Sequence, residues 1–150
     1  MKLSGWGRYP IHECSVNYPR SEEELKTYVK QGFSIANGNG RSYGDSALSI
    51  SNTISMKYFN HMLDFNNDTG ELVLESGVLL ADVISTFLPL GWFPSVTPGT
   101  KFVTIGGMIA ADVHGKNHHK HGSFGNFVNW IELIDSDGNG IYDPYQGDYP

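Results

Sequence analysis

The chain has 150 residues, a formal net charge of −6 and 17% charged residues, and its lysines and arginines form no cluster. This balance argues against a nucleic-acid-binding surface, and a single cysteine, Cys14, excludes an internal disulfide and a cysteine-based metal site. A chain of this length can bury about 70% of its extended surface, which suffices for one core but not for a large two-domain enzyme.

The sequence shows neither the pattern of a signal peptide nor that of a membrane span. Residues 1–10 contain two glycines and a proline and lack an apolar run. The most apolar stretch, residues 77–93, is interrupted by polar residues and a proline and is too short to cross a bilayer. We therefore expect a cytoplasmic protein whose partners are small molecules, and the sequence does not indicate its oligomeric state.

The first predicted helix spans residues 22–31. Ser21 and Glu24 have the spacing of a capping box, and apolar residues recur at helical spacing as far as Gly32, which ends the element. Residues 33–36 then predict a short buried strand that leads into a glycine-rich loop.

Strands and a hairpin are predicted in the middle of the chain. Residues 46–56 alternate small, apolar and polar side chains as a strand does, and 53–56 is the strand expected within them. Residues 63–65 and 71–75 are also predicted strands, and the turn-forming residues 66–70 between them indicate a hairpin.

The second half of the chain alternates helices with one more strand. Residues 79–88 have the apolar spacing of one helix face, and Pro89 with Gly91 ends that helix. Residues 104–111, rich in glycine and alanine, predict a helix that could press against a flat ring, and residues 128–134 predict the last strand. Strands before, between and after helices indicate an α+β fold.

The glycine-rich loop, NGNGRSYGD over residues 37–45, is the most informative motif. Glycine adopts positive φ at little cost, so successive amides can converge on one anion such as a diphosphate. The loop departs from the fingerprint G-x-G-x-x-G because its third glycine, Gly44, lies one place late and because a strand is expected after it. An ordinary glycine-rich surface turn has the same composition.

A second segment, residues 98–125, contains seven glycines and prolines and four histidines, with few bulky side chains. Its motifs HGKNHH and GSFG, together with GRSYGD and the opening SGWGRYP, resemble the flavin-binding domain of the vanillyl-alcohol oxidase superfamily, which includes sugar-lactone and alditol oxidases. Within it, the motifs resemble the decaprenylphosphoryl-ribose 2′-oxidases in particular. The resemblance runs from about Leu3 to about Gly138.

This resemblance implies a PCMH-type FAD-binding domain made of two small α+β subdomains with mixed sheets. It implies oxidation of a CH–OH group of a sugar, polyol or lipid-linked sugar, with residues 1–150 forming the N-terminal part of the FAD-binding domain. The substrate domain would be absent, so this chain alone is expected to be inactive. A noncatalytic nucleotide- or flavin-binding module is the alternative function.

The resemblance also assigns residues to the cofactor. Those expected around the diphosphate and adenosine are Ala36, Asn37, Gly38, Asn39, Gly40, Arg41, Ser42, Tyr43, Gly44, Asp45 and Ser46. Those expected along the ribityl chain and isoalloxazine are Pro98, Gly99, Thr100, Thr104, Ile105, Gly106, Gly107, Ala111, Asp112, Val113, His114 and Gly115. His114, near the flavin, and Lys116, which would face an anionic or polyhydroxylated substrate, are the expected catalytic residues; a solvated surface lysine is the alternative for Lys116.

Arg41 predicts that FAD is bound noncovalently. Relatives that attach flavin through this loop carry histidine at that position, and a guanidinium cannot attack the 8-methyl group of the flavin. The alternative for Arg41 is a surface arginine paired with a carboxylate such as Asp45.

Two possible metal sites are set aside. His114, His118, His119 and His121 lack the spacing of H-E-x-x-H, so we expect His118 and His119 to orient loop backbone and His121 to be solvated. Residues 135–140, DSDGNG, resemble the first half of an EF-hand loop, but its twelfth position is Gln146 instead of glutamate. A hairpin turn built on Asp-Gly and Asn-Gly explains them better.

Overall fold

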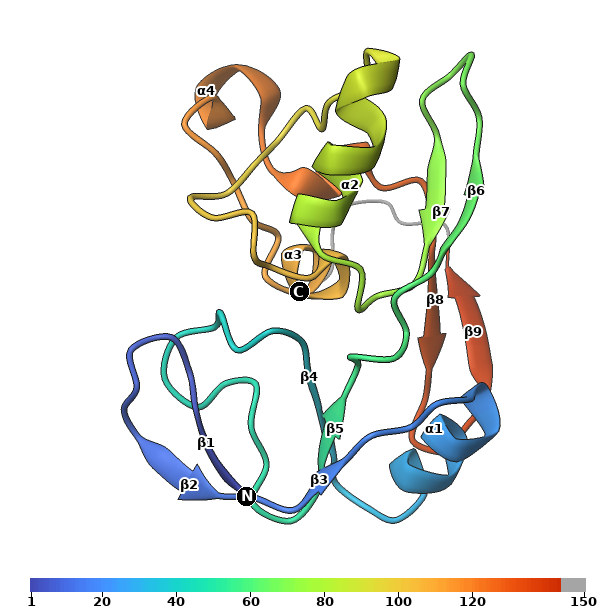
Figure 1. The fold of residues 1–150 in the computed structure, drawn as a ribbon. Coiled ribbons are helices and arrows are strands. Elements are labelled where there is room, and N and C mark those ends of the chain that lie inside the picture. The colour runs from blue at the N-terminus through green and yellow to red at the C-terminus, as the bar shows by residue number, and fades with distance from the viewer. Residues whose placement is uncertain (144–150) are drawn as a thin grey trace. The chain divides into compact units, whose positions relative to one another are not determined.

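The computed structural model describes residues 1–143 and divides the chain into two compact units (Figure 1). Among the described residues, unit 1 comprises residues 1–59 and 132–141, and unit 2 comprises residues 60–131 with 142 and 143. Each unit has its own small sheets and helices. The mixture confirms the α+β class. Within residues 1–143, no helix combines the length and the apolar character that a membrane span requires.

Unit 1 contains three sheets. In the first, β1 (Lys2–Ser4) pairs antiparallel with β2 (Ile11–Glu13). In the second, β3 (Val16–Asn17) and β4 (Ile35–Asn37) both pair in parallel with β5 (Thr53–Ser55), which lies between them. The third, which lies in unit 1 except for residue 131 and residues 142 and 143, pairs β8 (Ile131–Ile134) with β9 (Gly140–Asp143).

The helix of unit 1, α1 (Glu22–Val29), begins where the spacing of Ser21 and Glu24 predicts, but only the Ser21 half of the capping box forms. The Ser21 hydroxyl accepts a hydrogen bond from the Glu24 amide at 3.2 Å, and the Glu24 carboxylate accepts one from the Arg20 amide at 2.7 Å. The helix ends two residues earlier than predicted, because the amides of Gln31 and Gly32 bond three residues back and tighten the last turn. Gly32, with φ of 127°, then redirects the chain.

Two strand predictions in unit 1 are wrong in part. The predicted buried strand 33–36 is displaced to Ile35–Asn37, and Phe33 is 77% exposed. Within residues 46–56, only Thr53–Ser55 is a strand. The preceding residues turn instead, because the Thr53 hydroxyl bonds to both the amide and the carbonyl of Ser49 and so competes with a strand ladder.

Unit 2 begins with the predicted hairpin of β6 (Met62–Phe65) and β7 (Leu72–Leu74). The predicted helix 79–88 is α2 (Leu80–Phe87), which continues into the 3-10 turn η1 (Leu88–Leu90) and ends at Gly91, with φ of 86°. The remaining helices are α3 (Ile105–Ala110), α4 (His118–His121) and the 3-10 turn η2 (Phe124–Phe127). The strand predicted over 128–134 begins only at Ile131.

The core of unit 2 joins the hairpin to its helices. Its buried members come from α2, from α3 and from a position two residues before α2, and they are Val78, Leu80, Val83, Phe87, Ile105 and Met108. Phe65 of β6 packs on Phe87 with ring centroids 4.3 Å apart. This core fixes α3, and therefore the segment that leads to the histidine-rich loop.

Candidate functional site

The glycine loop of unit 1 leaves its main chain available to a ligand. Gly40 and Gly44 have φ of 62° and 59°, the left-handed region, and a Cβ added at either would meet no atom within 4 Å. Among residues 1–143, the amides of residues 40–46 find no hydrogen-bond acceptor. The side chain of Asn37 closes the base of the loop by donating to the Ala47 carbonyl at 2.9 Å. The loop therefore presents a run of main-chain donors suited to an anion.

Among residues 1–143, Arg41 is held in place without a carboxylate. Its Nη1 donates to the Asn39 carbonyl at 3.0 Å, and its guanidinium lies over the Trp6 ring, 4.9 Å from the centroid. Its Nε is buried and has no partner in the described part of the chain. The alternative that Arg41 pairs with Asp45 is wrong, because Asp45 pairs with His12 at 3.3 Å.

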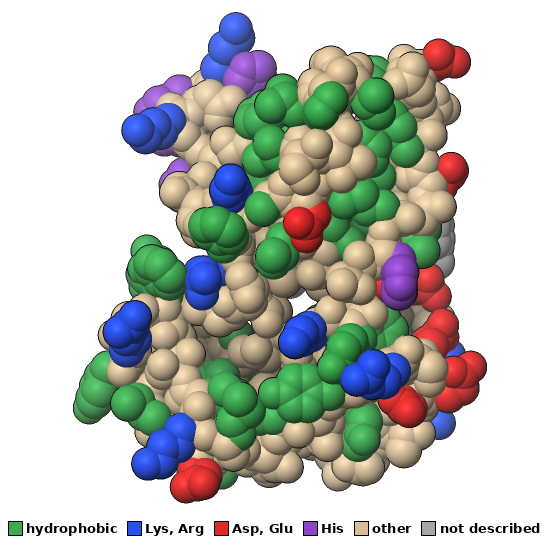
Figure 2. Space-filling view, in the orientation of Figure 1, with side chains coloured by type: hydrophobic (Ala, Val, Ile, Leu, Met, Phe, Trp, Pro, Cys, Tyr) green, Lys and Arg blue, Asp and Glu red, His purple; other side chains and the backbone are tan. Residues whose placement is uncertain are grey.

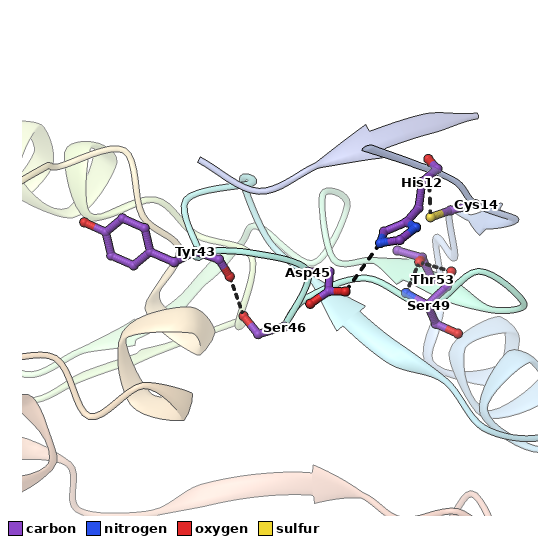
Figure 3. A network of polar contacts seen from close by, with 7 residues as sticks. All are labelled: His12, Cys14, Tyr43, Asp45, Ser46, Ser49 and Thr53. Carbon is purple, nitrogen blue, oxygen red and sulfur yellow. Dashed lines mark hydrogen bonds and ion pairs between the residues drawn. The ribbon is translucent and has the colours of Figure 1, made fainter. Parts of the chain in front are cut away.

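Figure 3 shows how the end of the loop is attached to unit 1. The His12–Asp45 pair joins the loop to β2, and the Ser46 hydroxyl donates to the Tyr43 carbonyl at 3.1 Å. The Tyr43 ring points away from this pair and is 80% exposed. Within residues 1–143, neither the Ser42 nor the Tyr43 hydroxyl has a hydrogen-bond partner, so both could donate to a ligand as expected.

The N-terminal segment Ser4–Arg8 packs directly on the loop, which reasoning from local pattern did not predict. The Trp6 amide donates to the Ser42 carbonyl at 2.8 Å. Gly5 lies so close to the loop that a Cβ there would be 2.5 Å from the Ser42 oxygen and in contact with the Gly44 oxygen. The motif SGWGRYP marks this segment, but nothing in its spacing identifies the loop as its neighbour.

The second predicted segment lies in unit 2, and several of its residues have structural tasks. Thr104 is 7% exposed and caps α3 by accepting from the Gly107 amide at 3.2 Å, and Ile105 is 8% exposed in the core. A Cβ on Gly106 would lie 2.7 Å from Ser76 Cβ. Close packing on Ser76 therefore explains this glycine without a flavin ring.

The chain then turns toward the histidine-rich loop. Asp112 has φ of 39°, and its carboxylate accepts from the Gly125 amide at 2.9 Å, which ties the two ends of that loop together. A second hydrogen bond joins the same two ends of the loop, because the Val113 carbonyl accepts from the Phe124 amide at 2.8 Å. A Cβ on Gly115 would lie 2.6 Å from the Thr97 carbonyl. The other predicted residues here have exposed or half-buried positions, and they are Pro98, Gly99, Thr100, Gly107 and Ala111.

His114 and Lys116 are both exposed, and Figure 2 shows histidine and lysine side chains gathered around α4. The His114 and His118 rings meet edge to face with centroids 5.2 Å apart, and those of His118 and His119 are 3.8 Å apart. His118 Nδ1 lies 3.1 Å from the Gly115 carbonyl, consistent with a role in orienting the loop. Over the part of the chain that the structure describes, no group of three or more His, Cys, Asp or Glu side chains could hold a metal ion.

The sequence DSDGNG forms the predicted hairpin turn between β8 and β9. The Asp135 carboxylate accepts from the amides of Asp137 and Asn139 at 2.9 and 2.8 Å, and Gly138 has φ of 77°. Hydrogen bonds from Asn139 hold the pKa of Asp135 below its ordinary value. Gln146, the twelfth position of the calcium-loop comparison, lies outside the described residues.

Comparison with known families covers both glycine-rich segments. Residues 15–141 match the family described as FAD binding domain. This chain belongs to that family. It therefore has the PCMH-type fold of FAD-binding domains, as the motifs implied.

Individual relatives agree with this assignment. The chain is 38% identical over 144 residues to decaprenylphosphoryl-beta-D-ribose oxidase of Mycolicibacterium smegmatis, covering 91% of this chain and 31% of that protein. It is 26% identical over 152 residues to a probable mitochondrial D-lactate dehydrogenase of Danio rerio, covering 93% of this chain and 30% of that protein. An alkyldihydroxyacetonephosphate synthase structure shares the fold, with a TM-score of 0.72 at 17% identity over 89% of this chain and 27% of that one.

The residues of the glycine loop fit the FAD diphosphate. Its amides offer several donors, the positive-φ glycines carry no side chain that would block their approach, and Arg41 adds a fixed positive charge. The loop contains no histidine or cysteine to bond covalently to the flavin.

Proposed function

We propose that this chain is the N-terminal part of the FAD-binding domain of an oxidoreductase that acts on the CH–OH group of a sugar, polyol or lipid-linked sugar. The observation that supports it best is the run of unpaired amides over residues 40–46, beside Arg41, in a member of this family. The relatives are named for a ribose derivative and for D-lactate, and both compounds carry a hydroxyl on the carbon that would be oxidised.

In this proposal each segment binds a different part of the cofactor. The amides of residues 40–46 and the Arg41 guanidinium bind the diphosphate, and the second segment, residues 98–115, lies along the ribityl chain and the flavin. FAD supplies the acceptor for the hydride that leaves the substrate carbon. His114 donates an imidazole N–H toward the cofactor, and Lys116 uses its positive charge to orient the substrate.

The proposal is tested first by cofactor binding. The purified chain should absorb near 450 nm or regain that absorbance with added FAD, and protein that stays colourless at saturating FAD would contradict it. A longer version that includes the substrate domain should bleach when an alditol or sugar substrate is added without oxygen. Flavin binding without bleaching by any such substrate would favour the noncatalytic module.

Noncovalent attachment is tested separately. Arg41 stands where covalent attachment would require another side chain, so acid precipitation should release the flavin into the supernatant. Flavin that stays in the protein pellet would show that another residue bonds to it.

A further inference from the structure

Unit 1 contains an open hollow of about 590 Å³ beside the glycine loop. Its lining comes from the N-terminal segment and from the loop, and it consists of Ser4, Gly5, Trp6, Arg8, Gly40 and Arg41. Two of these residues carry a guanidinium and none carries a carboxylate. The hollow is thus a positive site on a chain whose net charge is −6.

Arg41 is fixed at this hollow before any ligand arrives. The Trp6 ring supports its guanidinium, and Trp6 itself is anchored through its amide to the Ser42 carbonyl. One guanidinium nitrogen of Arg41 bonds to the Asn39 carbonyl, while Nε is buried without a partner. A donor buried in this way is unfavourable for folding, which indicates a role for Arg41 other than stability.

Arg8 reaches the hollow through an unfavourable backbone conformation. Its φ is 59°, in the region that residues with a Cβ seldom adopt, and its amide closes a turn onto the Gly5 carbonyl at 3.0 Å. Strained positions of this kind concentrate where a ligand is bound. Within residues 1–143, the Arg8 side chain has neither an ion pair nor a hydrogen bond.

We propose that the hollow is a phosphoryl-binding subsite in which Arg8 and Arg41 bind the anion. Guanidinium forks match phosphoryl oxygens in a bidentate arrangement, and the exposed indole of Trp6 offers a face to an adjacent planar or apolar group. The proposal rests on the proposed function because the phosphoryl group belongs either to the FAD diphosphate or to a phosphorylated substrate. It adds Trp6 and Arg8 to the binding residues.

The test compares three variants of the full 150-residue chain by calorimetric titration with FAD and with inorganic pyrophosphate. Arg8→Met removes the charge and keeps the aliphatic stem, and Arg8→Lys keeps the charge but loses the fork. Arg20→Met is the control, because it removes a guanidinium from the same unit at a residue that lies outside the hollow. Melting temperatures confirm that each variant is folded.

Arg8→Met should weaken binding of pyrophosphate about tenfold or more, the loss expected for one charge-assisted hydrogen bond, and Arg8→Lys should lie between it and the wild type. Arg20→Met should bind as the wild type does. If Arg8→Met weakens binding of FAD as well as of pyrophosphate, the phosphoryl group is that of FAD. If FAD affinity is unchanged and the FAD-saturated protein still binds pyrophosphate through Arg8, the group belongs to a substrate.

The subsite is refuted if folded Arg8→Met binds both FAD and pyrophosphate as the wild type does, or if Arg20→Met loses as much affinity as Arg8→Met. Failure of the proposed function has a different result. In that case the wild type would bind no FAD at all, while Arg8-dependent binding of pyrophosphate would still be observed.

Discussion

Replacing Gly5 by alanine tests whether the N-terminal segment positions the glycine loop. The new Cβ would lie 2.5 Å from the Ser42 carbonyl oxygen and also contact the Gly44 oxygen. Both atoms are main chain, so no side-chain rotation relieves the overlap and either the loop or the segment must move. Overpacking of this kind costs about 1–3 kcal/mol, which corresponds to about a fivefold to a hundredfold change in an equilibrium constant.

We expect Gly5→Ala to weaken FAD binding by this factor, because the displaced loop residues carry the amides assigned to the diphosphate. The dissociation constant is measured by quenching of flavin fluorescence, and the free energy of unfolding by urea denaturation. Gly7→Ala is the matched control, since Gly7 lies in the same segment and a Cβ there meets no atom within 4 Å. If Gly5→Ala binds FAD as tightly as Gly7→Ala, the reasoning that couples the segment to the loop is refuted.

Three further predictions concern stability. Ser21→Ala should lower the free energy of unfolding by about 1 kcal/mol in urea, because the α1 cap is lost, and an unchanged value would contradict the capping box. Gly106→Ala should lower the melting temperature despite alanine's better helix propensity, because its Cβ would lie 2.7 Å from Ser76 Cβ; a higher melting temperature would show that propensity dominates. Asp135→Ala should destabilise at pH 7 relative to the neighbouring variant Asp137→Ala. Because the folded-state pKa of Asp135 is lowered, its contribution is present above the ordinary value of 3.8 and declines as the pH falls below it through the folded-state value, so a difference that does not shrink as the pH is lowered below 3.8 would contradict the assignment.

Helices α1 and α2 could be predicted because their ends are encoded locally. Ser21 and Glu24 lie at the start of α1. Pro89 and Gly91 lie just after α2 and end the helical segment that α2 and η1 form. The hairpin of β6 and β7 was predicted for the same reason, since Asn66 accepts from the amides of two residues in its own turn.

The short strands of unit 1 could not be predicted because their partners are distant in sequence. The pairing of β3 with β5 joins Val16 to Thr53, and a strand of two residues has no periodicity to detect. The alternation over residues 46–56 was misleading because serine and threonine side chains bond to nearby main chain there. The glycine loop was predicted from composition, but its contact with the N-terminal segment depends on tertiary packing.

The glycines themselves show why composition predicts a site only in part. Gly40 and Gly44 need positive φ and have open space around them, which suits an approaching ligand. Gly5 and Gly106 instead lack space for a Cβ because the protein's own atoms lie against them, and Gly7 has neither constraint. The sequence shows only a glycine in each of these three environments and does not distinguish them. The richness in glycine of residues 98–125 is therefore weaker evidence for a flavin contact than that of residues 37–45, and variants that add one Cβ at a time measure the difference directly.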